Sequence, residues 1–95
     1  MIVNRRTFIV KKGKMDEVVA LLVNNQPESG YRSRIYSSMF GPFDTVAVEI
    51  EAKDMDEYNR MFAEASRDPG WAEFVVKFDE LTVPGGTNEM WVLAG

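Results

Sequence analysis

Apolar and polar residues alternate along several short segments of the chain, with the period of two that is typical of β-strands. The pattern is clearest over residues 45–52, where Val46, Val48 and Ile50 would face one side of a sheet and Glu49 the other. Three further segments rich in β-branched and aromatic residues are predicted as strands, at 2–10, 31–40 and 88–94. The short Gly-Pro connection before residue 45 predicts an antiparallel hairpin with the preceding strand.

Other segments have the spacing of amphipathic helices. Over residues 14–25, apolar side chains recur at positions i, i+3, i+4 and i+7, which places them on one helical face. A second helix is predicted from Asp54 to about Ser66, because Asp54 and Glu57 have the spacing of a capping box.

This second helical region is predicted to be split. Asp68 would be the N-cap of a restarted helix, with Pro69 at its first position, where a missing N–H costs nothing. Trp71 then begins an apolar stripe that continues to Phe78. The sequence Pro-Gly-Gly at 84–86 predicts a loop before the last strand.

This order of elements predicts one α+β domain over residues 1–95. Because crossover connections are right-handed, the simplest closed arrangement is a ferredoxin-like βαββαβ fold with a split second helix and antiparallel sheet order 4-1-3-2. Helices can cover only one face of such a sheet, and the other face still carries apolar residues. We therefore expect a homodimer in which a second copy packs sheet to sheet about a two-fold axis.

The composition gives a second reason to expect a dimer, and it argues against nucleic acid and membranes as partners. The 95 residues include no cysteine, so no disulfide can compensate for the limited core of a short chain. The net charge of −4 argues against non-specific binding to nucleic acid. No apolar run approaches the roughly 20 residues of a membrane helix, and the N-terminal residues lack the order of a signal peptide. No membrane partner is expected, and the expected location is the cytoplasm.

The absence of histidine excludes several chemistries. Histidine is the commonest general base, a usual metal ligand and the usual axial ligand of haem. Without cysteine there is also no thiol nucleophile and no iron–sulfur site. The acidic segment 54–57 could hold a hard cation, but a helix N-terminus explains it better. We expect neither a metal site nor a cofactor.

Two segments carry a resemblance to a known family. Residues 36–62, YSSMFGPFDTVAVEIEAKDMDEYNRMF, and residues 67–81, RDPGWAEFVVKFDEL, resemble the dimeric α/β-barrel superfamily and, within it, the NIPSNAP-like proteins. The resemblance covers residues 31–83 and extends to the rest by element order. It implies a pocket between sheet and helices for a small hydrophobic or aromatic compound. The superfamily includes cofactor-independent monooxygenases, isomerases of muconolactone type and haem-degrading enzymes; the last use a histidine that this chain lacks.

Glu49 is the candidate catalytic residue. It lies on a strand predicted to be central in the sheet, where a partly desolvated carboxylate could act as a general base. The alternative, which the charge pattern favours, is a set of ion pairs across the neighbouring strands. The arginines available for these pairs are Arg5, Arg6, Arg32 and Arg34.

Five residues are candidates for binding a small aromatic compound: Asn4, Arg6, Arg34, Tyr36 and Trp71. The arginines would bind a carboxylate group, and Tyr36 would line an aromatic pocket. Asn4 is assigned by resemblance, because some oxygenase relatives place a substrate-binding asparagine on the same element. Trp71 also has the spacing of a packed core residue, which is the better explanation for it.

Two functions remain open from the sequence. The first is a cofactor-independent oxygenase or isomerase of a small aromatic compound, with Glu49 taking a proton. The alternative is a non-catalytic homodimeric module that binds a small ligand or another partner. A hollow space beside Glu49 would favour the enzyme, whereas fully paired arginines and glutamates would favour the module.

Overall fold

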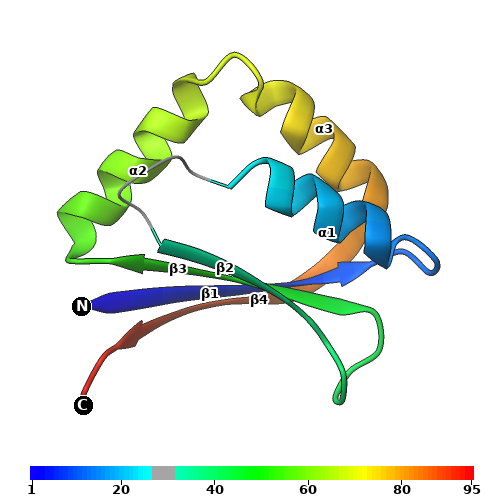
Figure 1. Cartoon of the computed structure of the whole chain (residues 1–95), viewed down its shortest axis with the longest axis horizontal. Coiled ribbons are helices and arrows are strands. Elements are labelled where there is room, and N and C mark those ends of the chain that lie inside the picture. The colour runs from blue at the N-terminus through cyan, green and yellow to red at the C-terminus, as the bar shows by residue number, and fades with distance from the viewer. Residues whose placement is uncertain (27–31) are drawn as a thin grey trace.

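The computed structural model describes residues 1–26 and 32–95, and these form a single antiparallel sheet with helices on one side. The strands are β1 (Ile2–Val10), β2 (Arg32–Ser37), β3 (Thr45–Ala52) and β4 (Thr82–Val92). Their order across the sheet is β2-β3-β1-β4, which is the predicted order read from the opposite edge. The predicted ferredoxin-like arrangement is therefore confirmed (Figure 1). Position 31, the predicted start of the second strand, lies outside the described residues.

The helices cover only one face of this sheet. They are α1 (Met15–Asn24), α2 (Met55–Arg67) and α3 (Trp71–Leu81), and Figure 1 shows them together above the strands. The opposite face carries no helix of the described residues; we call it the open face. Within the described part of the chain, no helix is long and apolar enough to span a membrane.

The core lies between the helices and the sheet, in two clusters. The first brings Val10 and Val46 of the sheet against Val18 and Leu22 of α1. The second packs the β3 residues Ile50 and Ala52 against α2, through Tyr58 and Met61. Since every strand residue in these clusters has an even number in β1 or β3, the alternation of period two decides which side chains enter the core.

The α2–α3 junction differs from the prediction at one end. Asp54 caps α2 as predicted, since its carboxylate accepts the Glu57 N–H at 2.9 Å. Asp68, however, is the C-cap of α2 and not the N-cap of α3. Its carboxylate accepts the Gly70 N–H at 2.7 Å, and this turn delays the start of α3 to Trp71. The predicted helix start at Pro69 was therefore wrong.

The hairpin between β2 and β3 is longer than predicted. β2 ends at Ser37 and not at residue 40, and residues 38–44 form the connection. Hydrogen bonds inside this segment close it: the Ser38 hydroxyl donates to the Phe40 carbonyl at 2.9 Å, and the Thr45 hydroxyl donates to the Pro42 carbonyl at 3.1 Å. In Figure 1 the hairpin bends below the plane of the sheet, toward the open face.

The predicted loop at 84–86 is instead part of β4, which starts at Thr82 directly after α3. The Pro-Gly-Gly signal marks an irregularity in the strand, where the pairing register with β1 shifts between Thr7 and Ile9. Gly86 has φ +100°, and a Cβ there would collide with the Thr7 carbonyl oxygen. Glycine therefore lets β4 pass close to β1 at this point.

Candidate functional site

The residues predicted to form one site are divided between the two faces of the sheet. Asn4 and Arg6 of β1 lie on the helix-covered face, because their ladder partners on β3 are the core residues Ile50 and Val48. Glu49 pairs instead with Arg5 and lies on the open face. Directly paired residues share a face of the sheet, so Arg34 and Tyr36, the partners of Glu49 and Ala47, are on the open face too.

Trp71 belongs to neither group. It is the first residue of α3, at the apex where α2 and α3 meet in Figure 1. Its ring is only partly buried and lies against Phe74, with the ring centroids 5.8 Å apart. Trp71 is not among the residues that form or pack against the two core clusters, so the core position predicted for it was wrong; α3 packs on the core through Phe74 and Phe78 instead.

On the helix side, Asn4 is the centre of a buried polar cluster. Its side chain is only 2% exposed. Its Oδ1 accepts the Tyr58 hydroxyl at 2.7 Å and the Arg6 Nε at 3.0 Å. Its Nδ2 donates to the Asn88 Oδ1 at 2.7 Å and to the Glu89 carbonyl oxygen at 2.9 Å. The amide therefore uses both donors and both lone pairs, which fixes its orientation.

Arg6 is held in this cluster by neutral groups. Besides Asn4, its guanidinium donates to the Tyr58 hydroxyl at 3.1 Å and lies over the Phe62 ring, 4.6 Å from the centroid. Among residues 1–26 and 32–95, no carboxylate forms an ion pair with Arg6. A partly buried cation without a paired anion is costly, and its N–H groups are suited to bidentate binding of a carboxylate.

The sheet beside Arg6 is uncovered on the helix side. Asn88 is the ladder partner of Arg6 on β4, and Met90 is the ladder partner of Asn4. Both are exposed, Met90 by 41%. We call Arg6, Asn88 and Met90 the Arg6 shelf. It offers a positive group, an amide and an apolar surface side by side, which suits a small aromatic anion.

On the open face, the charges are paired across the strands. The Arg5 guanidinium contacts the Glu49 carboxylate at 2.6 Å, and Arg34 contacts Glu51 at 3.0 Å. Arg32 approaches the same Glu51 at 3.7 Å. The glutamates are the more buried partners, with Glu49 only 16% exposed. The predicted cross-strand ion pairs are therefore present.

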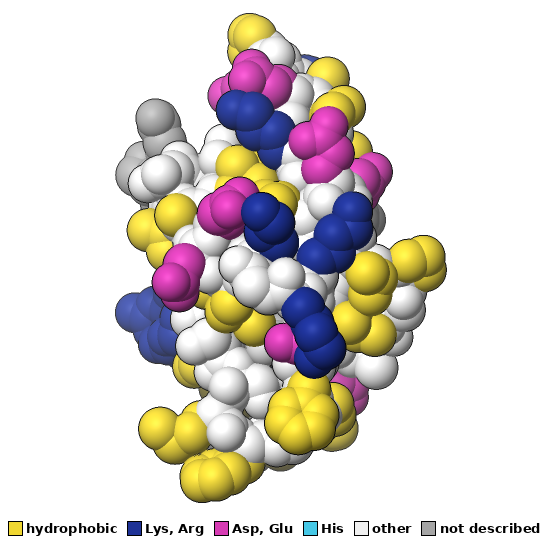
Figure 2. All heavy atoms as spheres, turned by 90° about the vertical axis from the view of Figure 1, so that its right-hand side faces the viewer, with side chains coloured by type: hydrophobic (Ala, Val, Ile, Leu, Met, Phe, Trp, Pro, Cys, Tyr) yellow, Lys and Arg dark blue, Asp and Glu magenta, His cyan; other side chains and the backbone are white. Residues whose placement is uncertain are grey.

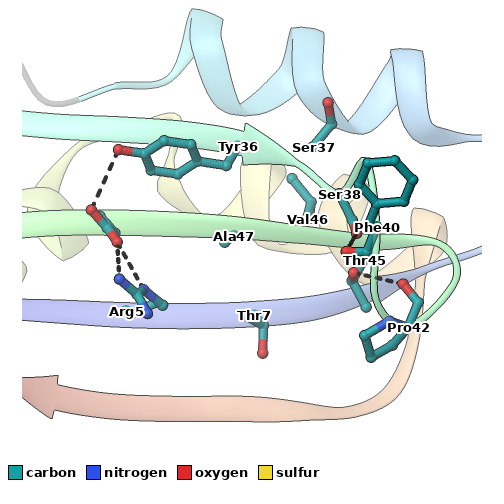
Figure 3. A pocket seen from close by; sticks show the side chains of 11 residues that line it. Arg5, Thr7, Tyr36, Ser37, Ser38, Phe40, Pro42, Thr45, Val46 and Ala47 are labelled. Atoms are coloured by element: carbon teal, nitrogen blue, oxygen red, sulfur yellow. Dashed lines mark hydrogen bonds and ion pairs between the residues drawn. The ribbon is translucent and has the colours of Figure 1, made fainter.

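A groove lies along this open face, between the sheet and the β2–β3 hairpin. Its volume is about 610 Å³. Figure 3 shows Tyr36 and Arg5 at one end of it and Phe40 and Pro42 of the hairpin at the other. Glu49 lines the end with Arg5, whose Nε donates to its carboxylate at 2.8 Å. The Tyr36 hydroxyl is 3.5 Å from the Glu49 Oε1, a long hydrogen bond. Glu49 thus lies at a groove on the face away from the helices, and not in the pocket between sheet and helices that the resemblance implies; its carboxylate is engaged by Arg5.

Two members of the helix-side cluster were missed in the sequence. Tyr58 has the spacing of an apolar helical stripe with Met55 and Phe62, which hides its polar role, although a buried tyrosine hydroxyl needs a partner and so marks polar surroundings. No sequence pattern marks Asn88, because its position beside Arg6 depends on the pairing register between β1 and β4. No group of three or more acidic residues in the described ranges is placed to hold a metal ion.

Comparison with known proteins gives the class of the fold. No family model matches the chain, and no curated protein matches it in sequence. Solved structures do match, and among them are NIPSNAP proteins from Burkholderia xenovorans and Agrobacterium tumefaciens. The first has a TM-score of 0.84 at 18% identity, over 99% of this chain and 95% of that one. The second has a TM-score of 0.83 at 18% identity, over 98% and 92%.

A putative antibiotic biosynthesis monooxygenase from Chloroflexus aurantiacus also matches, with a TM-score of 0.76 at 12% identity over 99% of this chain and 93% of that one. The chain therefore has the same ferredoxin-like fold as these proteins. In particular, it is similar to the NIPSNAP proteins, and the resemblance predicted from the sequence is confirmed for the fold.

The Asn4 cluster predicts different costs for two tyrosine-to-phenylalanine changes. Tyr58→Phe removes the hydroxyl that donates to Asn4 and accepts from Arg6, so we expect a loss of about 2 kcal/mol in the free energy of unfolding. Tyr36→Phe removes an exposed hydroxyl with one long hydrogen bond and should cost about 0.5 kcal/mol or less. Urea unfolding measures both, and equal costs would show that the cluster contributes no stability.

Proposed function

We propose that the chain is a homodimeric small-ligand-binding protein that pairs through its open face and binds a small aromatic anion on the Arg6 shelf. The proposed ligand class rests on the Arg6 guanidinium, which is oriented by neutral partners and has no paired carboxylate among the described residues. The observation that supports pairing is the charge balance of the open face.

The open face is electrically neutral in an acidic chain. By their ladder positions, its charged members in the described residues are three arginines and three glutamates: Arg5, Arg32, Arg34, Glu49, Glu51 and Glu89. The whole chain has a net charge of −4, so two copies repel elsewhere but not across this face. The face also exposes Trp91 by 53% and Tyr36 by 46%, aromatic surface that a partner sheet would bury. A second copy is therefore the partner that fits it.

The shelf supports an aromatic carboxylate as the ligand class. The guanidinium would bind the carboxylate in a charge-assisted, bidentate manner, and Asn88 lies beside it to add a hydrogen bond. Met90 offers an adaptable apolar surface for a ring. The geometry of Arg6 does not depend on the ligand, because Asn4 and Tyr58 already hold it, and such preorganisation favours binding.

An enzyme that oxygenates or isomerises a small aromatic compound is the alternative. The name of the Chloroflexus structure points the same way, although a likeness at 12% identity extends only to the fold. In this alternative Glu49 would be the base and Arg34 and Tyr36 would orient the substrate. Glu49 would first have to leave Arg5, since their contact of 2.6 Å occupies the carboxylate. The binding function needs no such rearrangement and is the one we favour.

The ligand assignment predicts that benzoate binding depends on Arg6. Arg6→Met should weaken benzoate binding by about tenfold or more, because a hydrogen bond to a charged group is worth about 1.5–3 kcal/mol. Isothermal titration calorimetry measures the affinity. Arg60→Met is the matched control, since Arg60 is an exposed arginine of α2. Equal affinities for wild type and Arg6→Met would exclude the shelf as the binding site.

The pairing assignment predicts that a charge on the open face breaks the dimer. Trp91→Asp replaces exposed apolar surface with an acid that upsets the charge balance of the face, so the dimer dissociation constant should rise by at least tenfold. Sedimentation equilibrium measures it. Val76→Asp is the control, because Val76 is exposed to a similar extent on α3. A wild-type protein that sediments as a 10.8 kDa monomer at every concentration would disprove the proposal.

A further inference from the structure

The groove on the open face has a floor and an end wall but no roof. Strands β1, β2 and β3 form the floor, through residues such as Thr7, Ala47 and Tyr36. The hairpin forms the wall, through Phe40 and Pro42 (Figure 3). A specific small-molecule site buries most of its ligand, which an open groove of this kind cannot do by itself.

The hairpin that forms the wall carries apolar side chains that its own chain leaves exposed. Met39, Phe40 and Phe43 are exposed by 87%, 90% and 89%. Figure 2 looks along the sheet from the hairpin end and shows hydrophobic side chains gathered at the lower margin, on the side away from the helices. Because the hairpin bends toward the open face, whatever packs on that face also meets these side chains.

We propose that a second copy of the chain roofs this groove, and that the resulting cavity binds an uncharged, hydroxylated aromatic compound. The proposal rests on the pairing through the open face proposed above. It adds a second type of ligand site, separate from the Arg6 shelf, which lies on the opposite face of the sheet. This site is incomplete in a single chain and exists only in the dimer.

The charges of the groove decide the class of ligand. Its ionic residues, Arg5 and Glu49, neutralise each other at 2.6 Å, so the lining offers no net charge to a ligand. The hydroxyl groups of Thr7 and Tyr36 supply the remaining polarity on this face. The Thr7 hydroxyl is already bonded to Thr87, whereas the Tyr36 hydroxyl is held by one long hydrogen bond. Such a lining suits a ring with hydroxyl groups, and it would not compensate the desolvation of a charged compound.

The charges near the hairpin and on the open face favour a second copy of the chain, and not an anionic membrane, as the cover of the groove. The hairpin does lie beside lysines, and a lysine-flanked apolar tip is a feature of membrane-binding surfaces. Lys12, however, is paired with Asp44 at 3.0 Å, and Lys14 with Glu17 at 3.3 Å, which leaves Lys11 as the one lysine of this segment without an ion pair among the described residues. The open face itself is neutral, as described above, so the attraction that an anionic bilayer needs is weak at this end of the molecule.

A site completed by pairing couples ligand binding to dimerisation. A compound that binds the dimer and not the monomer must stabilise the dimer by mass action. With two such sites, a ligand at ten times its dissociation constant lowers the dimer dissociation constant by roughly a hundredfold. A ligand of the Arg6 shelf would leave that constant unchanged, because the shelf lies on the face of the sheet opposite to the proposed interface.

The test measures dimerisation by sedimentation equilibrium with and without 2-naphthol, a neutral hydroxylated aromatic probe. We expect 2-naphthol to lower the dimer dissociation constant of the wild type at least tenfold, and benzoate to leave it unchanged. Phe40→Ser, which removes the groove wall, should abolish the effect of 2-naphthol. Val76→Ser, at an exposed apolar position on α3 that does not line the groove, should keep it.

Titration of the monomeric Trp91→Asp variant completes the test. This variant should not bind 2-naphthol and should still bind benzoate, which also shows that it is folded. A wild-type dimer whose dissociation constant is the same with and without 2-naphthol would overturn the composite cavity and leave the proposed pairing intact. Equal 2-naphthol affinity in wild type and Trp91→Asp would overturn it as well. A wild type that is always monomeric, or vesicle binding that depends on Phe40 and Phe43, would overturn the pairing itself.

Discussion

The alternation of side chains along β1 is the constraint on which the rest of the structure depends. β1 is an inner strand, paired with β3 on one side and β4 on the other. Asn4 and Arg6 therefore point under the helices, while Arg5 and Thr7 point to the open face. A shift of one residue in the register would bury Arg5 against α2 and expose Asn4, so the two surfaces of the protein are fixed together.

Polar and charged side chains are satisfied in different ways on the two faces of the sheet. Under α2, Asn4 is buried and can be tolerated only because all four of its hydrogen-bonding sites are used. Arg6 is anchored to it and has no paired carboxylate among the described residues. On the open face, Arg5 and Glu49 neutralise each other, which permits a second neutral face to approach. One face thus presents a cation without a paired carboxylate among the described residues, and the other presents balanced charges.

Much of the fold could be predicted because its signals are local. The alternation in β3, the capping box at Asp54 and the helical stripes all depend on residues a few positions apart. The start of β4 could not be predicted, since Gly85 and Gly86 usually mark a turn and only the approach of β1 explains them within a strand. Likewise, Asp68 has the composition of an N-cap, but its carboxylate serves the turn before α3.

The candidate site was harder to predict than the fold, for a physical reason. Arg5 and Arg6 are neighbours in the sequence, and the choice of which one meets Glu49 depends on the pairing register between β1 and β3. The charge pattern predicted cross-strand pairs but not their members. The helix-side cluster requires Asn4, Tyr58 and Asn88 to converge from three elements, and no spacing along the chain records that convergence.

Thiol labelling tests the central claim, that the open face meets a second copy. The chain has no cysteine, so single cysteines report cleanly on their own positions. Trp91→Cys places one on the open face, and Val76→Cys places one at a similarly exposed position on α3. The account predicts that the cysteine at 91 is labelled at least tenfold more slowly than the one at 76 in concentrated protein, and equally fast after dilution to monomer. Equal rates at every concentration would contradict it.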